Sequence, residues 1–274
     1  MGANKSEKSE NSVPYKSYKI ATIGSHSALQ ILYGAKQEGF STIAICEKGR
    51  ERPYQSFKVA DEIMMVDSFR DTIKLQDKLL RENAILIPHG TFFDAFKLEE
   101  LEKLKVNYFG NKAILKWEAD RMKQREWLKR AGLTLPKIYK KPEEIDGPVI
   151  VKFYGAQGGK GFFLARTAEE FYRKIKGREA KGEIRAYIIQ EYIIGAPIYI
   201  HYFYSPLTGE LEIMSFDKRY ESNVDSIGRI AAKDQLDLGL ETSYNITGNV
   251  PIVVRESLLP EIFRMGEAVV KRLG

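Results

Sequence analysis

The chain has 274 residues, of which 43% are hydrophobic and 29% charged, and a formal net charge of +6 at pH 7. These values are typical of a folded protein and exclude a chain that is disordered throughout. No apolar stretch is long enough for a membrane-spanning helix, so no membrane partner is expected. The basic excess is modest and spread along the chain, and it suits anionic small molecules as well as nucleic acids.

Two features indicate the cellular compartment. Residues 1–17 are polar and lack the apolar centre of a signal peptide, so they are predicted to form a disordered tail. The single cysteine, Cys46, excludes an internal disulfide and lies in an apolar segment, 41–46. We predict a buried strand thiol there rather than a catalytic one, and a reducing, cytoplasmic location.

Residues 18–110 alternate between strand and helix patterns. The predicted strands span residues 18–23, 41–46, 62–66 and 84–88, and the predicted helices span residues 28–37 and 71–83. Gly39 is expected to end the first helix in left-handed backbone. Short apolar strands between amphipathic helices predict a parallel α/β sheet, whose ligands bind at the carboxyl ends of the strands. The segments 24–27 and 89–92 are therefore candidate binding loops.

The character of the chain changes in its second half. A charged helix is predicted over residues 111–131, ended by Gly132, and the domain boundary is placed just before it. Further strands are predicted at 149–154, 161–165, 187–192, 198–204 and 210–216, with helices at 168–175 and 256–273. A hairpin turn is expected at 205–209, and the later strands are expected to be antiparallel. The fold class is thus an α/β domain, 18–110, followed by an α+β domain, 111–274.

The strongest candidate site is the strand that contains Lys152 and the glycine-rich segment after it. A lysine within an apolar strand is costly unless its ammonium group meets an anion. Glycines at 155, 158 and 159 let backbone N–H groups approach phosphate oxygens, so the segment is a candidate triphosphate cradle. Taken alone, the pattern equally fits a tight β-hairpin with an exposed lysine at its edge. It is neither a Walker loop nor a dinucleotide-binding fingerprint.

A second candidate follows at 187–195, where an apolar strand leads into Gln190, Glu191, Tyr192 and Ile193. Such a segment can present backbone groups to an adenine edge, with apolar side chains above and below the ring. By itself, however, it is better interpreted as a plain buried strand.

The remaining candidates are weaker. The charged segment 217–223 is usual for a solvated face, although Glu221 could contact a ribose or a metal-bound phosphate. Asn249 follows a glycine, which favours a turn residue. His26 and His89 end predicted strands without a second metal ligand nearby, so phosphate or amide recognition is preferred to zinc binding. The aromatic cluster of 92, 93 and 96 fits a core or pocket wall better than nucleic-acid binding.

The order of these motifs resembles the ATP-grasp superfamily: a helix, Gly132-Leu133 and Pro136, the strand with Lys152, the glycine loop, and Gln190 to Gly195. The resemblance then narrows to the PurP family of formate-dependent ligases over residues 18–274. It is carried by Ala21-Thr-Ile-Gly-Ser-His26, Pro88-His-Gly-Thr91, His201-Tyr-Phe-Tyr-Ser-Pro206, Asp217-Lys-Arg-Tyr-Glu-Ser-Asn223 and Ile246-Thr-Gly-Asn249. The resemblance implies an ATP-grasp fold with an N-terminal parallel α/β domain.

The resemblance also implies a reaction and its residues. Enzymes of this family formylate AICAR (5-aminoimidazole-4-carboxamide ribonucleotide) with formate and ATP, giving FAICAR, ADP and phosphate in purine (IMP) biosynthesis. His26, Thr91 and Asn249 match positions that hold AICAR. The nucleotide is implied to contact Lys152, the glycines Gly155, Gly158 and Gly159, the hinge residues Gln190, Glu191, Tyr192 and Ile193, and also Glu221. No covalent protein nucleophile is required, and no catalytic residue is assigned.

The family resemblance carries expectations about partners as well. Mg²⁺ is the expected metal, with Mn²⁺ as an alternative, and the carboxylates that hold it are expected beyond Gly274, so the chain is expected to be incomplete at its C-terminus. A homo-oligomer is expected, and no nucleic-acid partner. The alternative function is a catalytically silent or truncated nucleotide-binding relative.

Overall fold

The computed structural model describes residues 17–118, 120–153, 162–179, 186–221, 223–240 and 246–272. By its internal contacts, the chain divides into two compact units, Met1–Gln124 and Arg125–Gly274. The predicted boundary before Asn111 stays a proposal.

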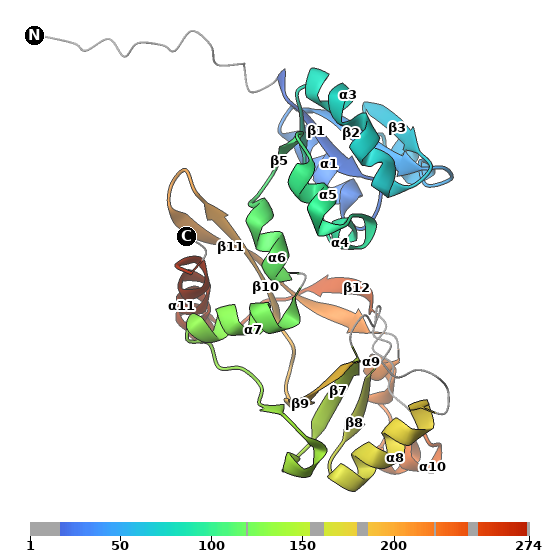
Figure 1. Ribbon diagram of the computed structural model, residues 1–274, viewed down its shortest axis with the longest axis vertical. Helices are drawn as coiled ribbons and strands as arrows, with labels where there is room; N and C mark the ends of the chain where they lie inside the picture. The colour runs from blue at the N-terminus through green and yellow to red at the C-terminus, as the bar shows by residue number, and fades with distance from the viewer. Residues whose placement is uncertain are drawn as a thin grey trace, which may run out of the picture. The chain divides into compact units, whose positions relative to one another are not determined.

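The first unit is built on a five-stranded sheet (Figure 1). All of its strand pairs are parallel, and their order is β3-β2-β1-β4-β5. The strands are β1 (Lys19–Ile23), β2 (Ser41–Glu47), β3 (Glu62–Val66), β4 (Ala84–Leu86) and β5 (Asn107–Tyr108). Strands β1 to β4 are short and mainly apolar, and β2, the longest, is buried on both faces from Thr42 to Cys46, as is usual in a parallel sheet.

Helices cover both faces of this sheet. They are α1 (Ala28–Gln37), α2 (Arg52–Ser56), α3 (Gln76–Arg81), α4 (Thr91–Ala95) and α5 (Leu98–Lys103), with a 3₁₀ helix η2 (Phe69–Leu75) before α3. Ala44 and Cys46 of β2 pack with Leu32 of α1 in one buried cluster. Their neighbours Ile43 and Ile45 lie in a second, larger cluster on the opposite face. The alternation of side chains along β2 therefore supplies two cores, as expected for a doubly wound sheet.

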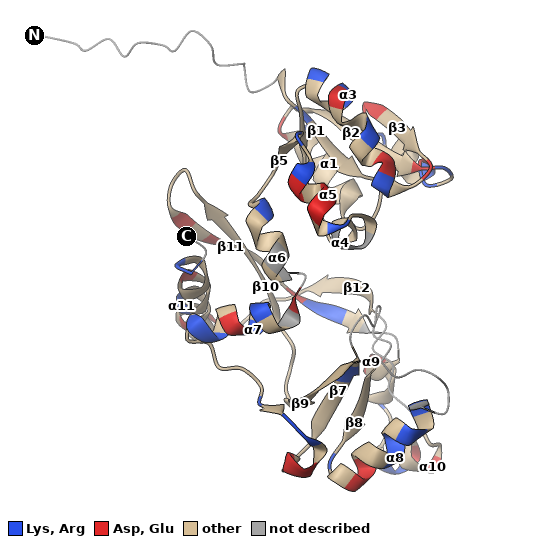
Figure 2. Cartoon of the chain, viewed as in Figure 1, with Lys and Arg blue, Asp and Glu red and all other residues tan. Residues whose placement is uncertain are grey.

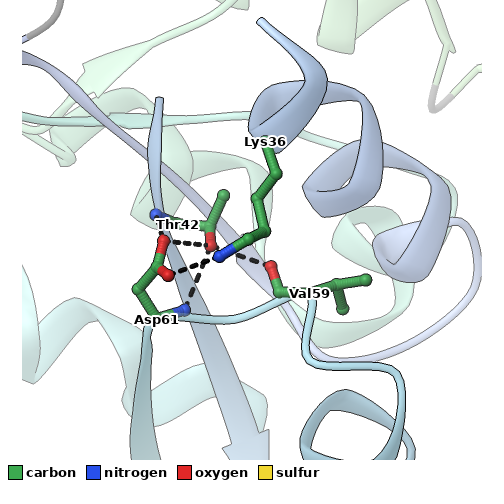
Figure 3. Close-up of polar contacts among 4 residues, drawn as sticks. All are labelled: Lys36, Thr42, Val59 and Asp61. Atoms are coloured by element: carbon green, nitrogen blue, oxygen red, sulfur yellow. Dashed lines mark hydrogen bonds and ion pairs between the residues drawn. The ribbon is translucent and has the colours of Figure 1, made fainter. Parts of the chain in front are cut away.

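Asp61 joins three elements at the amino ends of the strands (Figure 3). Its carboxylate pairs with Lys36 of α1 and accepts the Thr42 backbone N–H of β2 at 2.9 Å. The Thr42 hydroxyl lies 2.8 Å from the Val59 carbonyl oxygen and 2.9 Å from Asp61 Oδ2. Burial opposes ionisation of Asp61, but the hydrogen bonds from Lys36 and Thr42 outweigh it and hold the carboxyl pKa below its usual 3.8. We name these four residues the Asp61 clamp.

The predicted helix over 111–131 is wrong as a single element. The structure has a 3₁₀ turn η3 (Lys112–Ile114) and two helices, α6 (Leu115–Glu118) and α7 (Arg121–Arg130). Asp120 accepts the backbone N–H groups of Met122 at 2.9 Å and Lys123 at 3.2 Å, which makes it the N-terminal cap of α7. Helical spacing of apolar residues continues through such a cap, so the pattern did not reveal the break. Gly132, with φ +79°, lies just past the end of α7, as predicted.

The second unit contains two antiparallel sheets, which confirms the predicted α+β character. One has the order β6-β9-β7-β8 and consists of β6 (Ile138–Tyr139), β7 (Val149–Phe153), β8 (Phe162–Ala165) and β9 (Tyr187–Glu191). Helix α8 (Ala168–Glu179) packs on one face of this sheet through Phe171 and Ile175. A 3₁₀ turn η4 (Pro142–Glu144) lies between β6 and β7.

The other sheet has the order β10-β11-β12 and consists of β10 (Tyr199–Ser205), β11 (Glu210–Glu221) and β12 (Ile246–Pro251). Short helices α9 (Val224–Ile227) and α10 (Ala232–Asp237) follow β11, and η5 (Glu256–Leu258) leads into α11 (Leu259–Val270). Helix α11 lies against β10 and β11 (Figure 1), where the Tyr202 hydroxyl donates to the Ile262 carbonyl oxygen at 2.6 Å. Gly209, with φ +72°, occupies the predicted hairpin turn.

Candidate functional site

The first group of candidate residues lies where the strand order of the parallel sheet reverses. Strands β1 and β4 are neighbours there, and the chain leaves them in opposite directions along the sheet. The segments 24–27 and 87–90 follow the carboxyl ends of these two strands. A crevice for ligands forms at such a switch point in doubly wound sheets. The predicted binding segments 24–27 and 89–92 are thus brought to one place in the fold, although Thr91 and Phe92 of the second already belong to helix α4.

His89 holds the two loops together. Its Nε2 lies 2.9 Å from the Ile23 carbonyl oxygen, and the Thr91 backbone N–H donates to its Nδ1 at 3.3 Å. A carbonyl can only accept and an N–H can only donate, so Nε2 carries the proton and the ring is neutral. Burial lowers the pKa of His89 below 6.5, although its hydrogen bond to Ile23 acts in the opposite direction. Both ring nitrogens are therefore engaged within the protein, and the recognition of a phosphate or amide by His89 stays a prediction.

His26 is the exposed histidine of the pair. Its backbone is left-handed, with φ +45°, and its ring stacks on His89 with centroids 5.6 Å apart and an interplanar angle of 12°. The Nδ1 atom lies 2.5 Å from the Ser27 hydroxyl oxygen. A Cβ atom at Gly90 would lie 3.2 Å from His26 Nε2, so the glycine leaves room for the ring. These contacts fix the imidazole at the surface of the switch point.

Thr91 completes this group. Its hydroxyl donates to the Ser25 hydroxyl oxygen at 3.2 Å, so the two loops are joined a second time. Thr91 begins the short helix α4, whose next residue, Phe92, is fully buried and contacts the His89 ring edge-on at 5.4 Å. Phe92 and Phe96 are core residues, as predicted, whereas the side chain of Phe93 lies outside the described part of the structure.

Cys46 lies below the same loops but is not available for chemistry. The thiol is fully buried, and burial raises its pKa to about 11. A Cβ atom at Gly24 would lie 2.7 Å from Cys46 Sγ, and the Gly24 N–H donates to the Ile45 carbonyl oxygen at 2.6 Å. The predicted buried strand thiol is confirmed. Residue 24 must be glycine, because a side chain there would collide with Cys46 Sγ.

The second group lies on the sheet β6-β9-β7-β8. Lys152 is half-buried in β7, an interior strand, so it is not the exposed edge lysine of a hairpin. Its partner in register is Ile188, and the partner of Ile150 is Gln190. Paired residues share a face, so Lys152 and Gln190 lie together on the face opposite α8, as diagonal neighbours about 7–8 Å apart. The glycines Gly155, Gly158 and Gly159 lie outside the described residues.

The segment after β9 is held by backbone and carboxylate contacts. Glu191 accepts the Lys137 backbone N–H at 2.8 Å and returns its own N–H to the Lys137 carbonyl oxygen at 2.8 Å. The Tyr192 N–H donates to the Pro148 carbonyl oxygen at 2.8 Å, and Ile193 is 58% exposed. The Glu191 carboxylate therefore ties the end of β9 to the residue that precedes β6.

The third group lies on the sheet β10-β11-β12. The charged segment that begins at Asp217 continues β11 instead of following it, so its side chains alternate between two faces. Asn249 lies within β12, opposite Arg219 in register, and is therefore not a turn residue. Glu221 ends β11, and its side chain lies outside the described part.

Two contacts on this sheet were missed by sequence reasoning. His201 Nε2 lies 3.0 Å from Asp217 Oδ1, and the Arg219 guanidinium carbon lies 4.1 Å from the centre of the Tyr199 ring. The residues in each pair are 16 and 20 positions apart, and only the register of β10 with β11 brings them together. The predicted strand ended at Phe216, whereas β11 continues to Glu221. A prediction that continued the strand past Phe216 would have placed Asp217 and Arg219 on the same face.

The described ranges contain neither a cluster of metal-binding side chains nor a candidate membrane span. No group of three or more histidine, cysteine, aspartate or glutamate side chains could hold a metal ion among these residues. Within the same residues, no helix has the length and apolar character to cross a bilayer.

Comparison with known proteins places this architecture in a family. Two family models match the chain: a protein of unknown function (DUF1246) over residues 20–139 and a domain of unknown function (DUF1297) over residues 170–273. The 5-formaminoimidazole-4-carboxamide-1-(beta)-D-ribofuranosyl 5'-monophosphate synthetase of Methanocaldococcus jannaschii is 50% identical over 261 residues, which cover 92% of this chain and 72% of that protein.

Solved structures agree with this relationship. The IMP biosynthesis protein PurP from Thermococcus kodakaraensis superimposes with a TM-score of 0.69 at 28% identity, covering 92% of this chain and 74% of that one. The ADP complex of N5-carboxyaminoimidazole ribonucleotide synthetase gives a TM-score of 0.65 at 15% identity, covering 93% and 63%, which supports the fold alone. The fold is the predicted ATP-grasp fold with an N-terminal parallel α/β domain, and the chain belongs to the PurP family of 5-formaminoimidazole-4-carboxamide ribonucleotide synthetases.

Proposed function

We propose that this chain is an ATP- and formate-dependent ligase that formylates AICAR to FAICAR in IMP biosynthesis. The observation that carries the proposal is the 50% identity with the Methanocaldococcus jannaschii synthetase over 261 residues. The chemistry needs activation, because formate has only hydroxide as a leaving group. A formate oxygen attacks the γ-phosphorus of ATP, ADP leaves, and formyl phosphate forms.

The second half of the reaction transfers the formyl group. The 5-amino nitrogen of AICAR attacks the formyl carbon, the bond between that carbon and the phosphate oxygen breaks, and phosphate leaves while the nitrogen loses a proton. The protein has to position the reactants and neutralise the phosphate charge, without a covalent nucleophile. Cys46 is buried and its thiol is protonated, so it does not serve as a nucleophile in this scheme.

We assign residues to the ligands on the same basis. Lys152 and the glycines at 155, 158 and 159 would hold the ATP phosphates, residues 190–193 the adenine, and Glu221 a further part of the nucleotide. The face that Lys152 shares with Gln190 supports the nucleotide assignment. His26, Thr91 and Asn249 would hold AICAR, which the position of His26 and Thr91 at the switch point supports. Mg²⁺ accompanies ATP as its counter-ion. A cytoplasmic homo-oligomer is part of the proposal.

The test is an assay with ATP, formate, AICAR and Mg²⁺ that measures FAICAR and phosphate. We expect phosphate release that requires both formate and AICAR. Lys152→Met should reduce the rate at least tenfold, because the phosphates lose a charge-assisted contact. Lys48→Met is the matched control, since Lys48 is exposed and paired with Asp67. Binding of ATP and AICAR without turnover would favour the silent nucleotide-binding relative, and absence of binding would refute both functions.

A further inference from the structure

One face of the sheet β10-β11-β12 carries a row of polar and aromatic side chains. Register pairs Tyr199 with Asp217 and Arg219 with Asn249. Residues that pair across a ladder, or alternate along one strand, share a face. The contacts of His201 with Asp217 and of Arg219 with Tyr199 agree with this placement. We name Tyr199, His201, Asp217, Arg219 and Asn249 the polar face.

The opposite face of the same sheet is packed. Tyr202 and Leu211 contact Gly266 of α11, where an added Cβ atom would lie 2.6 Å from either side chain. Lys218, which alternates with Arg219, forms an ion pair with Asp225 of α9 at 3.0 Å. The two cations at neighbouring positions of β11 are thus separated by the pleat, and only Arg219 joins the polar face.

The contacts of Arg219 suit an anion ligand. Its guanidinium carbon lies 4.1 Å from the centre of the Tyr199 ring, within the range of a cation–π contact. Such a contact does not use the N–H groups of the guanidinium as hydrogen-bond donors to a ligand oxygen, so they stay available for one. Asp217, the carboxylate two residues before Arg219 on the same face, is paired with His201. The guanidinium fork matches the geometry of two phosphate oxygens.

Asn249, the residue opposite Arg219 in register, indicates which phosphate group Arg219 would bind. Directly paired residues in an antiparallel ladder have Cβ atoms about 4.5–5.5 Å apart, so Asn249 and Arg219 can reach one ligand region. Under the proposed function, on which this inference rests, Asn249 holds AICAR, and its amide is suited to the carboxamide and amine edge of the base. The phosphate that must approach that edge is the one that moves from ATP to formate. We propose that Arg219, in contact with Tyr199, binds the transferred γ-phosphoryl group.

The test compares ligands that differ by one phosphate. Calorimetric titrations would measure the binding of AMP-PNP, ADP, AICAR and the AICAR nucleoside to the 274-residue chain and its variants. Arg219→Met should weaken AMP-PNP roughly tenfold or more, the size of a lost charge-assisted contact, and leave ADP and AICAR within about twofold. Tyr199→Leu should cause a smaller loss in the same direction, and Arg219→Lys an intermediate one. Lys218→Met removes an equal charge from the packed face and should leave all four affinities unchanged.

Each other outcome has a definite meaning. Equal weakening of AMP-PNP and ADP would show that Arg219 only maintains the sheet and would overturn the assignment. Weakening of AICAR but not of its nucleoside would assign Arg219 to the AICAR phosphate and also overturn it, as would an unchanged Arg219→Met variant. A wild-type chain that binds neither AMP-PNP nor AICAR would overturn the proposed function itself.

Discussion

His89 is a neutral side chain that orders the surface formed by the two loops of the switch point. It donates to Ile23 at the end of β1 and accepts from Thr91 at the start of α4. Protonation would remove the acceptor at Nδ1 and turn the Thr91 N–H away. Burial lowers the pKa of His89, so the neutral ring and its stabilisation are fully present above pH 6.5 and are lost as the pH falls through the lower pKa of the folded state.

We predict that His89→Leu weakens AICAR binding roughly tenfold, because Thr91 and the stacked His26 lose their support. His89→Asn, whose side-chain oxygen can replace Nδ1 as the acceptor, should retain more of the affinity. Calorimetry between pH 5 and pH 8 would measure both. In the wild type, AICAR affinity should decrease at acidic pH partly because His89 becomes protonated. The asparagine variant should lack that part of the decrease. Identical pH profiles for wild type and His89→Asn would contradict the role given to the imidazole.

At the scale of elements, two helical glycines have opposite surroundings. Gly266 of α11 faces Leu211 and Tyr202, whereas nothing lies within 4 Å of a Cβ atom built on Gly34 of α1. The Tyr202 ring cannot move aside freely, because its hydroxyl is bonded to the Ile262 carbonyl oxygen of the same helix. The contact between α11 and the sheet therefore depends on the absence of a side chain at one position.

We expect Gly266→Ala to destabilise the second unit by about 1–3 kcal/mol through overpacking. Gly34→Ala, the matched control, should stabilise the first unit by about 0.5–1 kcal/mol, because alanine loses less backbone entropy in a helix. Urea denaturation together with hydrogen exchange of the α1 and α11 amides would measure the two effects. A Gly266→Ala variant as stable as the wild type would mean that α11 can shift on the sheet.

Some helices and strands have the bounds that the sequence predicts, and others do not. Strand β3 begins and ends where predicted, and so does α1, since apolar periodicity and Gly39 mark them locally. The extension of β11 to Glu221 was missed, because its outer half carries the charges of a polar face and looks like a loop. The role of His89 depends on a carbonyl 66 residues away, which no local pattern records.

At the scale of the whole molecule, charge is distributed instead of concentrated. Charges of both signs lie on the same helices, such as α8 (Figure 2), which has acidic residues in its first turn and basic residues in its last. Glu170 and Lys174 of this helix form an ion pair at 2.9 Å. Binding to nucleic acid by electrostatics needs several phosphate contacts from one surface. An excess of +6 that is interspersed in this way provides a weak field for a polyanion.

We therefore predict no retention of the chain on immobilised single-stranded DNA at about 150 mM salt, near physiological ionic strength. Chromatography over a salt gradient would measure this, with a basic single-strand-binding protein as the positive control. Retention that falls steeply with added salt would revive nucleic-acid binding as a function.

The Asp61 clamp and the His89 loops occupy opposite ends of the first sheet. Thr42 of the clamp pairs with Ile20 of β1, and His89 contacts Ile23 three residues further along that strand, a rise of about 10 Å. The contacts that join α1, β2 and β3 therefore lie at one end of the strands, and the exposed loops with His26 and His89 lie at the other end. An engineer could attach a fluorescent reporter beside Lys36 and expect the far rim, with its two histidines, to stay as it was.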